Sequence, residues 1–164
     1  LLRKIKKHKP DTVILLGDLT DLKDNHSSVR VNSVCSWSHV LDQHTEIVIL
    51  KGNHDYIDNG LPFFGFLDYI DNVTFISHVT IIDNWLFLPH TRTPGKDWKG
   101  ISFRDYDYIF MHETLDGSLA SNGFEMESSL STKMFSGVRK KVFSGDIHVP
   151  QVMSKGKIEY VGCP

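Results

Sequence analysis

The chain has 164 residues, of which 40% are hydrophobic, and this is enough for the core of one ordinary domain over residues 1–164. Its 18 basic and 20 acidic residues give a formal net charge of -2, which excludes a global electrostatic attraction to nucleic acid or to an anionic membrane. The two cysteines have no CxxC spacing and no apolar run approaches the roughly 18 residues that span a bilayer, so we expect a cytoplasmic protein without a disulfide scaffold.

The predicted elements begin with a basic helix at residues 1–10, LLRKIKKHKP, which ends at a proline. The apolar run TVILLG at 12–17 predicts a strand that is buried on both faces. Residues 29–44 have the apolar spacing of a helix, and EIVILKG at 46–52 predicts a second buried strand. The succession of strand, helix and strand is typical of a βαβ unit with a parallel sheet.

The rest of the chain is predicted to contain one short helix, at 62–69, and several short strands. The apolar runs predict these strands at 73–77, 79–83, 85–89, 106–113 and 140–146, with a closing hairpin over 152–162.

Four strand-like runs stop at residues that can bind a metal ion. Because ligands of open α/β sheets bind at the carboxyl ends of the strands, we expect these residues to converge. A glycine directly precedes three of the four groups, where the chain must turn sharply off its strand. The groups are Asp18 with Asp21, Asn53 with His54 and Asp55, His112 with Glu113, and Asp146 with His148.

The donors in this set are carboxylates, an amide oxygen and imidazoles, with no thiolate among them. Such donors suit Mn²⁺, Mg²⁺, Fe²⁺ or Zn²⁺, and in particular a pair of ions bridged by one carboxylate. A pair of ions about 3.5–4 Å apart stabilises both the attacking and the leaving oxygen of a phosphoryl displacement. The pattern therefore favours a site for divalent ions, and a pair of ions there would suit phosphoryl chemistry.

In their order along the chain, these motifs resemble the signature of the calcineurin-like metallophosphoesterases. That signature is Asp-x-His, Gly-Asp-x-x-Asp, Gly-Asn-His-Asp or Gly-Asn-His-Glu, a lone His, and Gly-His-x-His. The chain matches its last four blocks at residues 17–21, 52–55, 112 and 145–148. The resemblance covers nearly the whole chain and implies an α/β fold, a sandwich of mixed β-sheets flanked by helices.

The resemblance also implies a role for each matched side chain. Asp18 is expected to bridge the two metal ions. Asn53, His112 and Asp146 are expected to complete the coordination of one ion, and His148 is expected to bind the other. Mn²⁺ is the expected metal.

The catalytic residues that the resemblance implies are His54 and Asp21. His54 is expected to protonate the leaving-group oxygen as a general acid, and Asp21 to orient and charge His54. Water activated by the two ions is the expected nucleophile. A phosphodiester is the expected substrate, while a phosphomonoester or a cyclic nucleotide stays open as an alternative.

The chain departs from the family signature at two places. The Asp-x-His block is absent, so we expect that the chain is a fragment whose first strand lies upstream. A whole chain without this block instead favours a non-catalytic assembly or DNA-binding subunit. Asp146 stands where the signature has His, and its harder oxygen donor favours Mn²⁺ or Mg²⁺.

Within the family, the closing segment VFSGDIHVPQVMSKGKIEYVGCP resembles DNA repair exonuclease subunits of the SbcD type, including phage versions. This resemblance implies DNA as the substrate, an ATPase subunit of the SbcC type as a partner, and a homodimer. It also implies a C-terminal cap, which lies beyond these residues.

Three further residues have an open interpretation. Asp55 and Glu113 directly follow ligand positions, and we expect them to support the ligands rather than to bind metal. His90 stands in the basic loop HTRTPGKDWKG, which is either a phosphate-contacting lip or, as we favour, a solvated loop.

Overall fold

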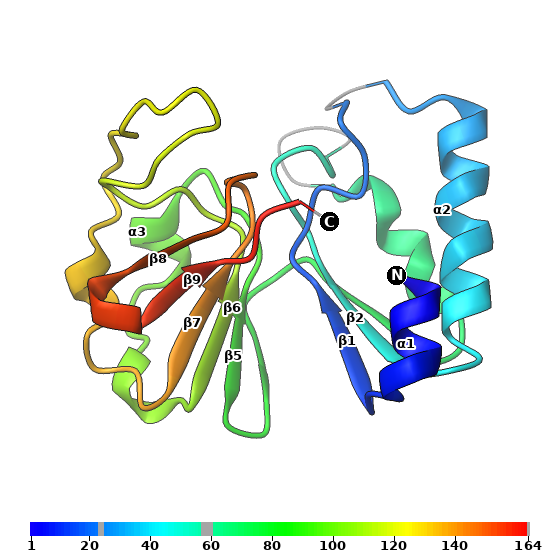
Figure 1. Ribbon diagram of the computed structural model, residues 1–164, viewed down its shortest axis with the longest axis horizontal. Coiled ribbons are helices and arrows are strands. Elements are labelled where there is room, and N and C mark those ends of the chain that lie inside the picture. Colours follow the sequence, from blue (N-terminus) through cyan, green and yellow to red (C-terminus); the bar gives the residue numbers. More distant parts are fainter. Residues whose placement is uncertain (23–24, 57–60, 164) are drawn as a thin grey trace. The chain divides into compact units, whose positions relative to one another are not determined.

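Two β-sheets with accompanying helices organise the chain (Figure 1). The computed structural model describes residues 1–22, 25–56 and 61–163. The chain divides into two compact units: unit 1 is Leu1–Ser77 and unit 2 is His78–Pro164. A three-stranded sheet lies in unit 1 and a six-stranded sheet in unit 2, which confirms the α/β fold class with parallel and mixed sheets.

Unit 1 contains the predicted βαβ unit. All three of its strands are parallel and follow the order β1-β2-β3. The elements of the unit are α1 (Leu2–His8), β1 (Thr12–Leu15), α2 (Ser28–Leu41), β2 (Glu46–Leu50), the 3-10 helix η1 (Phe63–Tyr69) and β3 (Val73–Ile76).

Local sequence signals set the C-terminal end of α1 and the N-terminal end of α2. The side chain of Ser27 caps α2 by accepting a hydrogen bond from the backbone amide of Arg30, 3.3 Å away. α1 ends where Lys9 adopts a left-handed conformation with a φ of 46°, directly before Pro10. The sequence predicted this stop at the proline.

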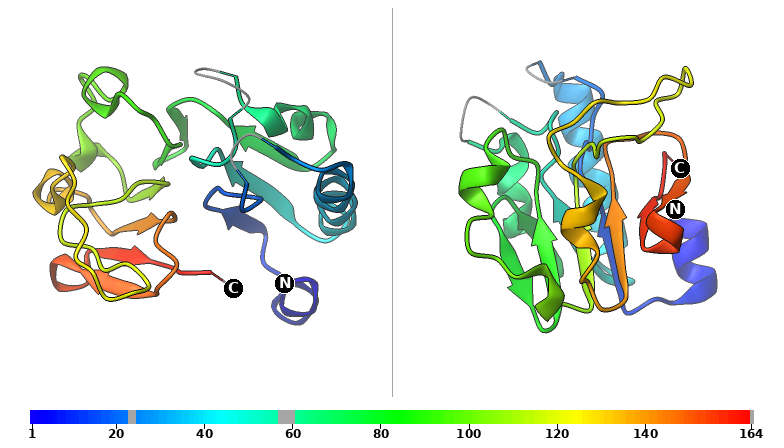
Figure 2. Two further views of the ribbon diagram at one scale, coloured as in Figure 1. Left: turned by 90° about the horizontal axis from the view of Figure 1, so that it is seen from above. Right: turned by 90° about the vertical axis from the view of Figure 1, so that its left-hand side faces the viewer.

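The core of unit 1 lies on the face of the sheet that the helices cover. Ile47 and Ile49 alternate with Val48 and Leu50 along β2, so the two pairs point to opposite faces. In Figure 2, α1 and α2 lie on the same side of this sheet. The buried residues of the core are Ile5, Val34, Leu41, Ile47, Ile49, Phe64, Leu67, Val73 and Phe75.

The sheet of unit 2 is mixed and has the order β4-β5-β6-β7-β9-β8. β5, β6, β7 and β9 are parallel, whereas the two edge strands are antiparallel to their neighbours (Figure 1). The elements are β4 (Thr80–Ile82), β5 (Trp85–Leu88), α3 (Pro94–Asp97), η2 (Phe103–Asp105), β6 (Tyr108–Met111), η3 (Thr132–Phe135), β7 (Lys141–Ser144), β8 (Gln151–Met153), η4 (Ser154–Gly156) and β9 (Ile158–Tyr160).

The two faces of this sheet differ in character. One carries a row of stacked aromatic rings: Phe110 lies 5.1 Å from Phe87 and 5.6 Å from Phe143, measured between ring centroids. The other face forms the core of unit 2. Its fully buried side chains include Leu86, Leu88, Ile109, Met111, Leu115, Phe135, Val142, Ile158 and Tyr160.

Several predicted strands were too long because their ranges included residues of the turn that follows the observed strand. The strand predicted over 12–17 ends at Leu15, because Gly17 and Asp18 have φ angles of 89° and 54°, which no strand can adopt. The loop predicted after β5 contains the single helical turn α3, which begins at a proline.

Along the described ranges, no helix has the length and apolar character needed to cross a bilayer.

Candidate metal centre

In unit 1, the first predicted ligand lies in a tight turn after β1. Asp18 has a φ of 54° and directly follows Gly17, whose φ is 89°. Asp146, in unit 2, repeats this conformation with a φ of 69° after Gly145. Non-glycine residues rarely adopt positive φ, and such residues gather at functional sites. Both aspartates of the predicted ligand set therefore stand in strained turns at strand ends.

Gly52 allows the loop after β2 to approach Asp18. A Cβ on Gly52 would lie 2.2 Å from Asp18 Oδ1 and 2.4 Å from its backbone nitrogen, and neither distance is sterically allowed. The close approach lets the backbone amide of His54 donate a hydrogen bond to Asp18 Oδ1 at 2.9 Å. Here the glycine is required by space rather than by its φ angle.

The carboxylate of Asp55 joins the two loops of unit 1. It is fully buried and accepts hydrogen bonds from the backbone amides of Gly52 at 2.7 Å, Asp18 at 2.9 Å and Leu19 at 3.2 Å. Hydrogen bonds to a charged acceptor are among the stronger ones in proteins. Asp55 thus holds the turn that carries Asp18, in keeping with the supporting role expected from the sequence.

The next two predicted residues, Asn53 and His54, form the turn after β2, and both are half-buried. The Nδ1 atom of His54 is buried and has no hydrogen-bond partner among the described residues. A buried polar atom in that state is unusual in a native protein and commonly accompanies a bound ion, water or ligand.

The structure places Asp21 on the surface of unit 1. Its side chain is 73% exposed and pairs with Arg30 of α2, with 3.1 Å between Oδ1 and Nη2. No hydrogen bond joins Asp21 to His54 within the described ranges. The role of Asp21 in orienting His54 stays a prediction.

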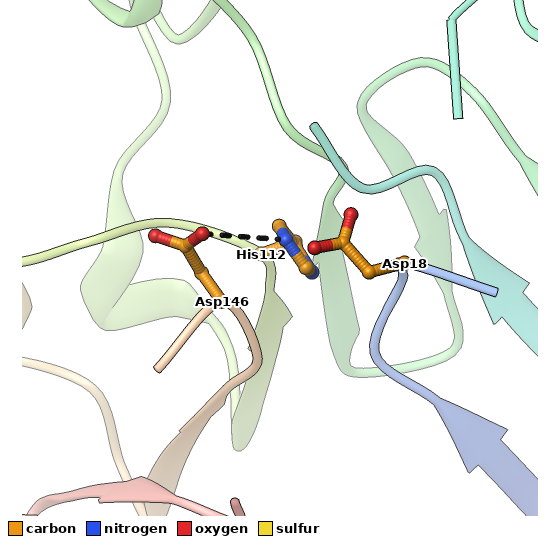
Figure 3. Close-up of side chains that lie close together, drawn as sticks. All are labelled: Asp18, His112 and Asp146. Atoms are coloured by element: carbon orange, nitrogen blue, oxygen red, sulfur yellow. Dashed lines mark ion pairs between the residues drawn. The ribbon is translucent and has the colours of Figure 1, made fainter. Parts of the chain in front are cut away.

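In unit 2, two predicted ligands lie together. His112 follows β6 and is 1% exposed, and Asp146 follows the neighbouring parallel strand β7. His112 Nε2 and Asp146 Oδ1 are 3.7 Å apart (Figure 3). The other carboxylate oxygen, Oδ2, accepts a hydrogen bond from the hydroxyl of Thr114. His148 is also in this unit, but it is exposed and its imidazole makes no hydrogen bond or ion pair within the described part of the chain.

A buried frame fixes the loop that follows His112. The hydroxyl of Ser144 accepts from the amide of Glu113 at 3.3 Å and donates to its carbonyl at 3.0 Å. The hydroxyl of Tyr160 donates to the same carbonyl at 3.0 Å and accepts from the amide of Leu115 at 2.8 Å. Burial raises the pKa of Tyr160 from 10.0 to about 12, so the hydroxyl stays a donor well into the alkaline range.

The Glu113 side chain brings a further histidine beside His112. Glu113 is buried, and its Oε1 accepts from the amide of Thr91 at 2.8 Å. Its Oε2 lies 3.4 Å from His90 Nδ1, and the ring of His90 is 6.3 Å from that of His112 between centroids. His90 is therefore held beside Glu113, whereas the basic side chains that follow it, Arg92, Lys96 and Lys99, are exposed as in the solvated loop that we favoured.

The sequence did contain a signal for His90. β5 ends at Leu88, and His90 follows it after one proline, as His112 follows β6 and Asp146 follows β7. This position falls in no block of the family signature, so the resemblance did not point to it. Thr114 and Tyr160 were not identified because their hydrogen bonds join residues 32 or more positions apart.

The donors present fit divalent cations. In unit 2 an imidazole nitrogen and a carboxylate oxygen are 3.7 Å apart, a span that one ion with ligand distances of about 2 Å bridges. In unit 1 the absence of a Cβ on Gly52 makes room for the carboxylate of Asp18 at the end of β2. The combination of carboxylate, amide and imidazole without thiolate is that of a hard or borderline metal.

Comparison with known proteins bears on the same residues. A sequence profile named calcineurin-like phosphoesterase matches residues 1–150 of the chain. A search of the curated proteins finds no significant match. The profile spans all four motifs that carry the strand-end residues, and it covers far more than half of the chain. The chain therefore belongs to the calcineurin-like phosphoesterase family, whose members are metal-dependent hydrolases of phosphate esters.

Proposed function

We propose that the protein is a nuclease that hydrolyses phosphodiester bonds of DNA with two divalent ions, in the first instance Mn²⁺. The observation that carries the metal-dependent reaction is the 3.7 Å separation of His112 Nε2 and Asp146 Oδ1 at the ends of neighbouring strands. DNA as the substrate is supported by the similarity of the closing segment to exonuclease subunits of the SbcD type. Pro164, the last residue of that segment, lies outside the described residues.

The proposed metal ligands are the five residues that the family resemblance implies. Asp18, Asn53, His112, Asp146 and His148 would hold the ions. When bound, such ions lower the pKa of water to near neutrality and offset the charge that develops on the phosphate. Asp55 and Gly52 keep Asp18 in place, and the Ser144 and Tyr160 hydroxyls keep the chain after His112 in place.

His54 is the proposed general acid. Its backbone amide is fixed on Asp18 Oδ1, so the imidazole starts from a residue that is held at the end of β2. It would donate a proton to the leaving-group oxygen as the ester bond breaks, so that an alcohol leaves in place of an alkoxide. For DNA, the leaving group is the sugar hydroxyl of the neighbouring nucleotide.

Mn²⁺-dependent turnover of four substrates tests this proposal. We expect hydrolysis of a fluorescently labelled DNA oligonucleotide and of bis-p-nitrophenyl phosphate, with much slower turnover of p-nitrophenyl phosphate and of cyclic AMP. Faster turnover of the monoester or of the cyclic nucleotide would assign the alternative substrates. Retention of Mn²⁺ without turnover of any substrate would assign the non-catalytic role. In that case an ATPase subunit, a second copy of the chain and DNA become binding partners to test.

A further inference from the structure

The inference concerns Thr114, which lies two residues after His112 and whose hydroxyl donates to Asp146 Oδ2. Asp146 is the position where the chain has a carboxylate and the family signature has an imidazole. A histidine offers a metal ion one nitrogen, whereas a carboxylate offers two oxygens and can bind through one or both. A residue that engages one of these oxygens therefore decides how the carboxylate binds.

The two oxygens of Asp146 have different neighbours. Oδ2 accepts the hydrogen bond of Thr114, and Oδ1 lies 3.7 Å from His112 Nε2. Oδ1 is thus the oxygen of Asp146 that is directed towards the imidazole of His112, as Figure 3 shows. In this arrangement Asp146 presents one donor atom beside His112, as the histidine of the signature would.

The two residues that flank Thr114 in the sequence, Glu113 and Leu115, are both held by hydrogen bonds. Glu113 exchanges two hydrogen bonds with the hydroxyl of Ser144, at 3.3 and 3.0 Å. The amide of Leu115 donates to the hydroxyl of Tyr160 at 2.8 Å. Because these anchors are buried, the hydroxyl of Thr114 stays in place and fixes the orientation of the carboxylate.

We propose that Thr114 is a positioning residue that makes Asp146 a metal ligand through one oxygen. The inference rests on the proposed metal-dependent function. The physical basis is that a hydrogen bond to a metal ligand from a neighbouring side chain fixes the orientation of that ligand. Thr114 acts only through Asp146, so its effect should vanish when Asp146 is replaced.

The test is calorimetric titration of Mn²⁺ and Zn²⁺ into the wild type, Thr114→Val, Thr114→Ser, Asp146→His and the Thr114→Val, Asp146→His double variant. Valine keeps the shape of threonine and removes the hydroxyl. We expect Thr114→Val to weaken Mn²⁺ binding by about 10- to 100-fold, the usual effect of removing a partner of a metal ligand. The affinity for Zn²⁺ should fall by a similar factor, because either ion needs the oriented carboxylate. Thr114→Ser should stay within about threefold of the wild type, because it keeps the hydroxyl.

The double-mutant cycle separates positioning from a general structural effect. In the Asp146→His background, Thr114→Val should change the Mn²⁺ affinity by less than about threefold, because no carboxylate remains to be oriented. An equal loss in both backgrounds, or no loss in Thr114→Val alone, would overturn the inference. If Thr114→Val fails to fold, Thr114→Ala in the same cycle gives the same comparison. A wild type that binds neither ion would instead refute the proposed function.

Discussion

The buried carboxylate of Asp55 accepts a hydrogen bond from the backbone amide of Asp18 at 2.9 Å, across 37 positions of sequence. It also binds the amides of Leu19 and Gly52, so one side chain connects the ends of β1 and β2. A proposed ligand is therefore held by a carboxylate that belongs to the next motif of the chain.

Asp55→Asn should destabilise unit 1. An amide has only one acceptor oxygen, so at least one of the three N–H groups, of which that of Gly52 is buried, loses its partner or faces another donor. We expect the free energy of unfolding to fall by about 2 kcal/mol or more. Urea unfolding in the presence of a chelator measures this without a contribution from metal binding.

Asp21→Asn is the matched control for that variant, because it makes the same chemical change at a side chain that is 73% exposed. Its loss should be below about 1 kcal/mol, as for other surface ion pairs. Equal losses in the two variants would show that the buried hydrogen bonds of Asp55 do not stabilise the fold.

Gly52→Ala should impair metal binding. The added Cβ would meet Asp18 Oδ1 at 2.2 Å, so one of the two loops must shift and the carboxylate moves. We expect the Mn²⁺ affinity to fall about tenfold or more, the scale seen when the support of a ligand is lost. Gly95→Ala is the control, since a Cβ there meets nothing within 4 Å. Calorimetric titration that gives the same affinity for both variants would contradict the role assigned to Gly52.

Tyr160→Phe should change how stability depends on pH. The pKa of Tyr160 is raised to about 12 in the folded protein, against about 10 in an unfolded chain. The folded state therefore retains the proton more tightly, so this stabilisation is complete below pH ~10 and is lost between pH ~10 and ~12. The wild type should lose roughly 2–3 kcal/mol relative to Tyr160→Phe over this range.

Urea unfolding of the two proteins at several alkaline pH values measures the difference. Tyr69→Phe is the control, because Tyr69 is 90% exposed and should leave the pH profile of the wild type unchanged. Parallel profiles for the wild type and Tyr160→Phe would be inconsistent with a buried, protonated hydroxyl.

His54→Ala tests the proposed general acid. Without a proton donor the leaving group of DNA departs as an alkoxide, so turnover of a DNA oligonucleotide should drop about 10²-fold or more. Turnover of bis-p-nitrophenyl phosphate should drop less, because p-nitrophenolate leaves without being protonated. Metal content should stay near that of the wild type, because the proposed role of His54 is proton transfer. DNA is the more sensitive substrate, since its leaving group is more basic than p-nitrophenolate. Undiminished turnover of DNA would remove His54 from the mechanism.

Much of the fold could be predicted because strand ends are marked locally. The runs at 12–17 and 46–52 are continuous and apolar, and each stops at a glycine, so both strands and the intervening helix followed from the sequence. The hairpin that joins β8 and β9 was also predicted, from Lys155 and Gly156. The order of the strands in unit 2 was not predicted, because it depends on pairings between distant segments.

The side-chain contacts of the candidate site were harder to predict from the sequence. Motif spacing identified His112 and Asp146, which the structure places within 3.7 Å of one another. It gave no indication that Thr114 binds Asp146 or that Glu113 anchors Thr91, because each pair is brought together only by the sheet. Asp21 also depended on tertiary structure, since its partner Arg30 lies on α2.

The central claim is that Asp18 and His112, each at the end of a strand, are ligands of divalent ions. The most direct measurement is the Mn²⁺ content of the wild type, Asp18→Asn and His112→Ala by plasma mass spectrometry after equilibrium dialysis. The account predicts that the wild type retains Mn²⁺ and that each substitution alone removes most of it. Unchanged Mn²⁺ content in both variants, or no retained Mn²⁺ in the wild type, would contradict it.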